Sequence, residues 1–252
     1  MKKVKTVLCV ILAFCFLAVI LYSGYQIVLI QNNYRAEAQT HDALIQYKPD
    51  GTPSPDQTQP DGQSTDNEIT NQSILALQAK YPDALGWLTV PNTKIDYPFA
   101  QYTDNDYYLH RDLEGKSLFA GTIFMDCRCE KDFTSQNTIL YGHNMKNGSM
   151  FGSLSSFNNK TFFQANQYGI IYLPHENLTL EFFAYMVVNP DTEKEVYNVT
   201  LSDTYFDYVK QNARYYRDIG LTSEDRIVTL STCAYEFNNA RMVLLARVTK
   251  SG

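Results

Sequence analysis

Histidine is scarce in this chain of 252 residues, which contains only four: His41, His110, His143 and His175. A metalloenzyme with several histidine ligands is therefore not expected, and no metal or other cofactor is predicted. Five cysteines are too few for a disulfide-stabilised scaffold of this length. Lys and Arg number 21 against 27 Asp and Glu, so the net charge is −6 and nucleic acid is not an expected partner.

The N-terminus combines three lysines with a long uncharged segment. Lys2, Lys3 and Lys5 precede residues 7–30, which contain no charged side chain. A helix over this segment is about 36 Å long, enough to cross the hydrocarbon core of a membrane. The positive-inside rule predicts a cytoplasmic tail at 1–6, a single-pass signal-anchor at 7–30 and an extracellular remainder. A cleaved signal peptide is the alternative, although Tyr22 and Gln26 do not suit its cleavage site.

Beyond the apolar segment the composition changes. Residues 31–67 include a stretch with four prolines and almost no apolar side chains. Such a stretch cannot bury enough surface to offset its conformational entropy, so 31–67 is predicted to be a disordered tether. The remaining residues, 68–252, suit one folded domain.

The pattern of this domain is mainly β. Eight short runs rich in Val, Ile, Leu, Phe and Tyr predict strands at 86–90, 94–99, 121–126, 137–141, 169–173, 179–188, 226–231 and 242–248. Helical spacing indicates a short helix at 74–81 and a longer one at 202–217, between the late strands. Eight strands with few helices favour a closed barrel or a sandwich.

Three reactive side chains lie at the ends of predicted strands. His143 follows the run at 137–141, where Gly142 permits a sharp turn, and Cys233 follows the run at 226–231. Arg241 immediately precedes the last strand, so it faces Cys233 across the mouth of one predicted hairpin. A thiolate attacks an amide carbonyl, an imidazole transfers protons, and a guanidinium stabilises an oxyanion. Together these side chains predict acyl transfer at an amide.

The same residues carry a resemblance to a known family. Residues 137–145, Asn-Thr-Ile-Leu-Tyr-Gly-His-Asn-Met, resemble the histidine motif of sortases. Residues 228–233, Val-Thr-Leu-Ser-Thr-Cys, followed by Arg241, are similar to their Thr-Leu-x-Thr-Cys and arginine motif. The resemblance includes Gly-Trp-Leu at 86–88, and the helical segments place it in class B.

This resemblance implies a closed eight-stranded barrel with a groove for an extended peptide. Cys233 would be the nucleophile, His143 the general acid and base, and Arg241 the oxyanion stabiliser. Sortases cleave a sorting signal of a secreted protein after threonine and transfer the acyl group to an amine of the cell wall. Since no carboxylate is obvious beside His143, a neutral thiol and a neutral imidazole are expected to predominate.

Substrate-binding residues follow from the resemblance less directly. Asn105 and Leu109 resemble class B residues that line the signal groove, although they also suit a helix start and a core position. Ser231 lies on the same strand face as Cys233, and Thr232 directly precedes it, so both are candidates for substrate contact. The loop at 192–197 is expected to form a wall of the groove.

Two other features are open to a functional interpretation. Cys127 and Cys129 form a C-x-C pair, but a second pair of zinc ligands is missing, so solvent-facing thiols are expected. Some class B members carry an acid directly after the cysteine, where this chain has Ala234, with Glu236 two residues further on.

Three alternatives to wall anchoring remain open at this point. A cysteine endopeptidase would resolve the same thioester with water. A class B sortase that polymerises pilin would use the same site with a different amine. A membrane-anchored binding module would retain the barrel without the chemistry, although the presence of all three reactive residues disfavours it.

Overall fold

Nine strands form one sheet that closes on itself. The computed structural model describes residues 2–50 and 69–250 of the chain. The strands follow the order β5-β1-β2-β3-β4-β8-β9-β6-β7, and β5 also pairs with β6. That additional pairing closes an eight-stranded barrel and leaves β7 outside the ring. The predicted closed eight-stranded barrel is confirmed, as are an N-terminal helix and a helix between the late strands.

The elements have the following bounds. The strands are β1 Ala84–Thr89, β2 Asp96–Ala100, β3 Ile123–Met125, β4 Asn137–Tyr141, β5 Tyr168–Tyr172, β6 Asn177–Val188, β7 Tyr215–Tyr216, β8 Ile227–Cys233 and β9 Arg241–Lys250. The α-helices are α1 Lys2–Leu44, α2 Gln72–Lys80, α3 Lys160–Ala165 and α4 Tyr205–Asn212. Short 3-10 helices are η1 Ile45–Tyr47, η2 Tyr107–Leu109, η3 Gly152–Asn158 and η4 Lys194–Tyr197.

Apolar side chains fill both faces of the late strands. Leu230 and Leu244 belong to the main core inside the barrel, whereas Val243 and Leu245 pack in a second cluster with Val209 of α4. This is why residues 242–246 form an unbroken buried run in β9. Each such side chain contributes about 1.5–3 kcal/mol on complete burial.

Strand direction brings two distant segments to one end of the barrel. β4 and β8 are parallel neighbours, with Tyr141 opposite Ser231. β8 and β9 are antiparallel, with Cys233 opposite Arg241. The carboxyl ends of β4 and β8 and the amino end of β9 therefore lie side by side.

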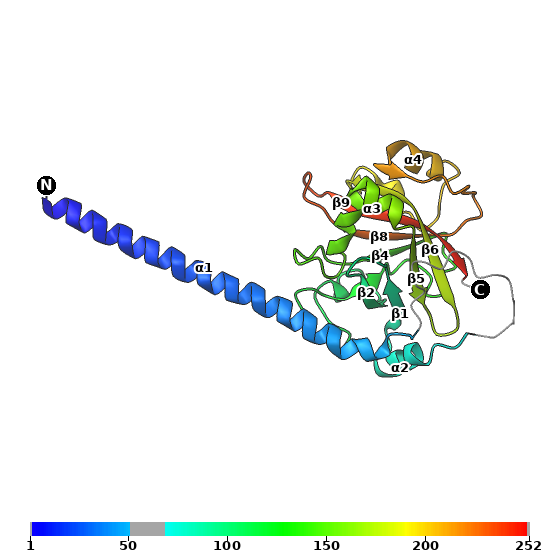
Figure 1. Ribbon diagram of the computed structural model, residues 1–252, viewed down its shortest axis with the longest axis horizontal. Helices are drawn as coiled ribbons and strands as arrows, with labels where there is room; N and C mark the ends of the chain where they lie inside the picture. Colours follow the sequence, from blue (N-terminus) through cyan, green and yellow to red (C-terminus); the bar gives the residue numbers. More distant parts are fainter. Residues whose placement is uncertain (1, 51–68, 251–252) are drawn as a thin grey trace.

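Helix α1 extends away from the barrel (Figure 1). Its 43 residues make it about 65 Å long. Residues from Ile11 onward have a mean hydropathy of 2.1 in the most apolar window, and none of that window is buried. By length and composition this helix can cross a membrane, as either an anchor or a signal sequence.

The predicted disorder of 31–67 is wrong in its first part. Residues 31–44 continue α1, and Glu37 and Leu44 are buried against the folded domain. Tyr97 of β2 donates a hydrogen bond to Glu37 Oε1 at 3.0 Å, and His41 Nε2 lies 2.9 Å from the carbonyl of Asp96. These polar partners on β2 order the segment. The proline-rich part of the predicted tether lies at 51–67, outside the described residues.

The helix predicted at 202–217 is shorter than its spacing indicated. Helix α4 ends at Asn212, and Tyr215–Tyr216 form β7. The reason is backbone pairing: the amides of Arg214 and Arg217 donate to the carbonyls of Tyr185 and Phe183 in β6. By contrast, the helix predicted at 74–81 corresponds closely to α2.

The docking of α1 makes a prediction for stability. Tyr97→Phe removes the hydrogen bond to the buried carboxylate of Glu37, which costs about 1–3 kcal/mol. We expect that decrease in the free energy of unfolding of the detergent-solubilised full chain, measured by guanidinium denaturation. Tyr168→Phe, on the 52% exposed Tyr168 of β5, is the control and should have almost no effect. Equal stability of the two variants would show that residues 31–44 do not dock.

Candidate active site

Cys233 and Arg241 face each other where β8 ends and β9 begins. They are directly opposed in the antiparallel ladder, a relation that puts Cα atoms about 4.5–5.5 Å apart. The preceding residues of β8 are buried, whereas the Cys233 side chain is exposed and Arg241 is half-buried. The predicted meeting of these two residues across a hairpin mouth is therefore present in the structure.

His143 reaches the same place along β4. The amide of Gly142 donates to the carbonyl of Ser231 at 3.3 Å, and Asn144 Nδ2 donates to the carbonyl of Cys233 at 2.7 Å. His143 lies between these two contacts, so the chain carries it alongside Cys233. Glycine is required at 142 for close packing and not for the predicted sharp turn. A Cβ at this position would lie 2.8 Å from Cγ of Phe151, which is too close for a side chain.

A main-chain carbonyl orients the imidazole. Nε2 of His143 lies 2.7 Å from the carbonyl oxygen of Leu109, at the end of η2. Since a carbonyl only accepts, Nε2 carries the hydrogen and Nδ1 remains the basic nitrogen of the neutral ring. The sequence showed no carboxylate for this task, and it gives no signal for a backbone partner 34 residues away.

The surroundings of His143 favour its neutral form. Burial lowers the pKa of His143, and the neighbouring His110 lowers it further, while the Leu109 carbonyl opposes this shift. The ring centroids of His110 and His143 lie 5.3 Å apart, and the ring of Phe119 stacks on that of His143 with centroids 6.3 Å apart. The resulting environment agrees with the neutral imidazole expected from the sequence.

Comparison with known proteins gives the family. The sortase domain model matches residues 88–249. Sortase B of Listeria monocytogenes is 35% identical over 98% of this chain and 100% of its own length. The Bacillus anthracis sortase B structure in complex with AAEK2 has a TM-score of 0.70 and 32% identity, covering 87% of this chain and 98% of its own. A Staphylococcus aureus sortase B–substrate complex has a TM-score of 0.67 and 26% identity, covering 73% and 87%.

The chain belongs to the sortase family. Its relatives place it in class B, as the sequence motifs indicated. The protein is accordingly a cysteine transpeptidase of the sortase type, an enzyme that acts on peptide bonds.

The other predicted site residues of this sortase occupy different positions around Cys233. Asn105 accepts a hydrogen bond at Oδ1 from the amide of Cys127, and Leu109 presents its carbonyl to His143. Ser231 shares the Cys233 face of β8. Strand alternation puts Thr232 on the opposite face with the interior residues, where it is 3% exposed. The structure thus groups Ser231 with Cys233 and separates Thr232 from them.

Tyr197 is a site residue that the sequence did not single out. It ends η4 in the predicted wall at 192–197, and its hydroxyl lies 2.9 Å from Oγ of Ser231. Burial raises the pKa of Tyr197 to about 12, and the nearby charges of Arg241 and Cys233 act on it in opposite directions. Only the tertiary contact with Ser231 distinguishes this tyrosine from the other 18 in the chain.

The C-x-C pair and Glu236 lie apart from the three reactive residues in their contacts. Cys127 is exposed as expected, but Cys129 is buried, and burial raises its pKa to about 11. The prediction of two solvent-facing thiols is wrong for Cys129 because its sulfur accepts from the amide of Ile139 in β4. Glu236 forms an ion pair with Arg214 at 2.6 Å, so its carboxylate is engaged away from His143.

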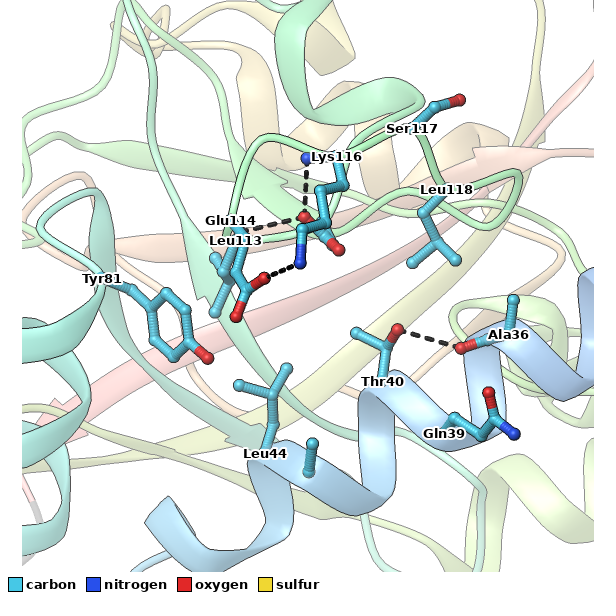
Figure 2. A pocket seen from close by; sticks show the side chains of 12 residues that line it. Ala36, Gln39, Thr40, Leu44, Tyr81, Leu113, Glu114, Lys116, Ser117 and Leu118 are labelled. Carbon is cyan, nitrogen blue, oxygen red and sulfur yellow. Dashed lines mark hydrogen bonds and ion pairs between the residues drawn. The ribbon is translucent and has the colours of Figure 1, made fainter.

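A cavity of about 380 Å³ lies elsewhere, between the end of α1 and the loop at 112–118 (Figure 2). Thr40 and Leu44 line one side and Leu113 and Lys116 the other, and Lys116 is ion-paired with Glu114. This cavity includes none of the three reactive residues.

The histidine pair makes a prediction for pH dependence. Since the pKa of His143 is lowered, the acidic limb of the kcat/KM profile of this sortase should fall below the ordinary value of 6.5. His110→Ala removes a neighbour that lowers this pKa, so the limb should move to higher pH. His175→Ala, in the turn between β5 and β6, is the control. A limb above 6.5 in the unmodified enzyme would contradict the neutral environment of His143.

Proposed function

We propose that this sortase is a membrane-anchored transpeptidase that cleaves a sorting signal after threonine and transfers the acyl group to a cell-wall amine. The observation that supports this proposal most directly is the convergence of three strand ends. Cys233 and Arg241 are cross-strand partners, and the Asn144 contact with the Cys233 carbonyl carries His143 beside them.

The proposed reaction assigns one role to each group. In the minor form in which the Cys233 thiol proton has moved to Nδ1 of His143, the thiolate attacks the scissile carbonyl. The resulting oxyanion is stabilised by the fixed N–H groups of Arg241. Protonated His143 gives the Nδ1 proton to the leaving amine, and a thioester forms. An incoming amine then loses its proton to Nδ1 as it attacks the thioester, which releases Cys233. The Leu109 carbonyl keeps the ring in one orientation through both transfers.

The signal peptide would lie between η2 and η4. Asn105 and Leu109 supply one side of this candidate groove, and Ser231 and Tyr197 supply the other. Thr232 is assigned a supporting place behind Cys233, because it lies on the interior face of β8.

The proposed location is the outer face of the cell membrane. The apolar segment 7–30 would span the bilayer as a single pass with residues 1–6 in the cytoplasm. Docking of residues 31–44 on β2 would then hold the catalytic domain close to the membrane, between secreted substrates and peptidoglycan precursors.

A transfer assay tests the proposed function. The full chain is incubated with Thr-containing pentapeptides copied from C-terminal signals of secreted proteins of the same genome, with and without triglycine or a diaminopimelate-type amine. We expect a ligated product by mass spectrometry. Hydrolysis alone, at an unchanged rate when amine is added, would instead identify an endopeptidase. Ligation of a pilin-derived lysine peptide in preference to both amines would identify a pilin polymerase.

Substitutions test the three roles. Cys233→Ala should abolish cleavage, and His143→Ala should reduce it by about a thousandfold or more. Arg241→Lys keeps the charge but loses the planar donor fork, so most activity should be lost. Lys210→Ala, in α4, is a surface control. Wild-type rates for an Arg241→Ala variant would remove Arg241 from the site.

A further inference from the structure

A short turn after β3 holds a carboxylate that the reaction does not use. Asp126 has no exposed surface, yet it accepts hydrogen bonds from Nε and Nη2 of Arg128 at 2.9 and 2.7 Å. Tyr141 at the end of β4 donates to the same carboxylate at 3.0 Å. Burial by itself would raise the pKa of Asp126, but these hydrogen bonds outweigh it and lower the pKa. The carboxylate is therefore an anion that fixes the guanidinium of Arg128.

The fixed guanidinium reaches the groove wall. Nη2 of Arg128 also donates to the main-chain carbonyl of Tyr197 at 3.1 Å. The ring of Tyr197 lies nearly parallel to that of Tyr141, with centroids 6.4 Å apart, and its hydroxyl contacts Ser231. A continuous set of contacts thus runs from Asp126 through Arg128 to the residue beside Ser231.

The same turn contacts the other side of the groove. The amide of Cys127 donates to Oδ1 of Asn105 at 2.8 Å. Gln101, directly after β2, donates to the carbonyls of Asp126 and Cys129 and holds the turn against the barrel. The turn at 126–129 is therefore bonded to both walls, to Asn105 and to Tyr197.

We propose that Arg128 is a positioning residue that holds Tyr197 and the η4 wall at the separation from Asn105 that the signal peptide requires. This proposal rests on the proposed function, since it concerns the same groove. Arg128 does not touch Cys233 or His143 in these contacts, so it acts on peptide binding and leaves the intrinsic reactivity of the thiol unchanged.

A purely structural ion pair is the competing explanation. It predicts lower stability on substitution with no selective change in peptide binding. Lysine distinguishes the two explanations because it keeps the positive charge beside Asp126 but cannot donate to Asp126 and Tyr197 through a planar fork. Arg128→Lys therefore leaves the buried carboxylate compensated and removes the guanidinium bond to Tyr197, while Asn137 still donates to the carbonyls of Val196 and Asn198.

Arg226→Lys is the matched control. Arg226 also donates from a guanidinium to a main-chain carbonyl, that of Phe133, at 2.8 Å. It precedes β8, at the end of that strand opposite to Cys233.

Four measurements are made on the full chain of each variant. The first is KM and kcat for the Thr-containing pentapeptide in the transfer assay. The second is the Kd of the fluorescein-labelled pentapeptide in a Cys233→Ala background. The third is the rate of Cys233 alkylation by iodoacetamide, monitored by mass spectrometry. The fourth is the melting temperature, which shows whether the variant is folded.

For Arg128→Lys we expect KM and Kd to rise about tenfold, with kcat and the alkylation rate within about twofold of wild type. Arg226→Lys should change none of these quantities. Unchanged KM and Kd for Arg128→Lys would overturn the positioning role, as would a melting-temperature loss without a change in Kd. If the wild type binds the pentapeptide without turning it over, the proposed function fails, whereas the Kd comparison still decides the role of Arg128.

Discussion

The parallel pairing of β4 with β8 is the constraint on which the site depends. Cys233 and Arg241 come together through a hairpin, which is local in the chain. His143 is 90 positions before Cys233, and only the side-by-side course of β4 and β8 brings it into reach. The pairing is secured by the apolar residues of both strands, so the core of the barrel and the geometry of the site have the same origin.

Main-chain groups perform much of the orientation in this sortase. The Leu109 carbonyl holds His143, the Cys127 amide holds Asn105, and the Tyr197 carbonyl receives Arg128. Backbone partners of this kind are fixed by the fold and require no particular side chain at their own position. Asn105, Tyr197 and His143 are therefore connected by hydrogen bonds to the loops that follow β2 and β3.

Docking of α1 on β2 adds a second constraint, on the whole domain. Glu37, His41 and Lys48 all contact residues of β2, so the segment between the apolar helix and the barrel is not free to reorient at its base. A sequence rich in polar residues looked like a tether because its partners, Asp96 and Tyr97, lie about fifty or more positions away. The local composition shows that a segment is polar, but it does not show whether distant residues will form hydrogen bonds with it.

The sequence by itself determined the β architecture, the three reactive residues and the family, because alternating apolar runs and short motifs are local properties. It also determined that Cys233 and Arg241 oppose each other, since a hairpin needs only neighbouring strands. The tertiary structure decided the orientation of His143, the burial of Cys129, the end of α4 and the contacts of the turn at 126–129. Each of these depends on a hydrogen bond or a packing contact between segments far apart in the chain, which no local pattern encodes.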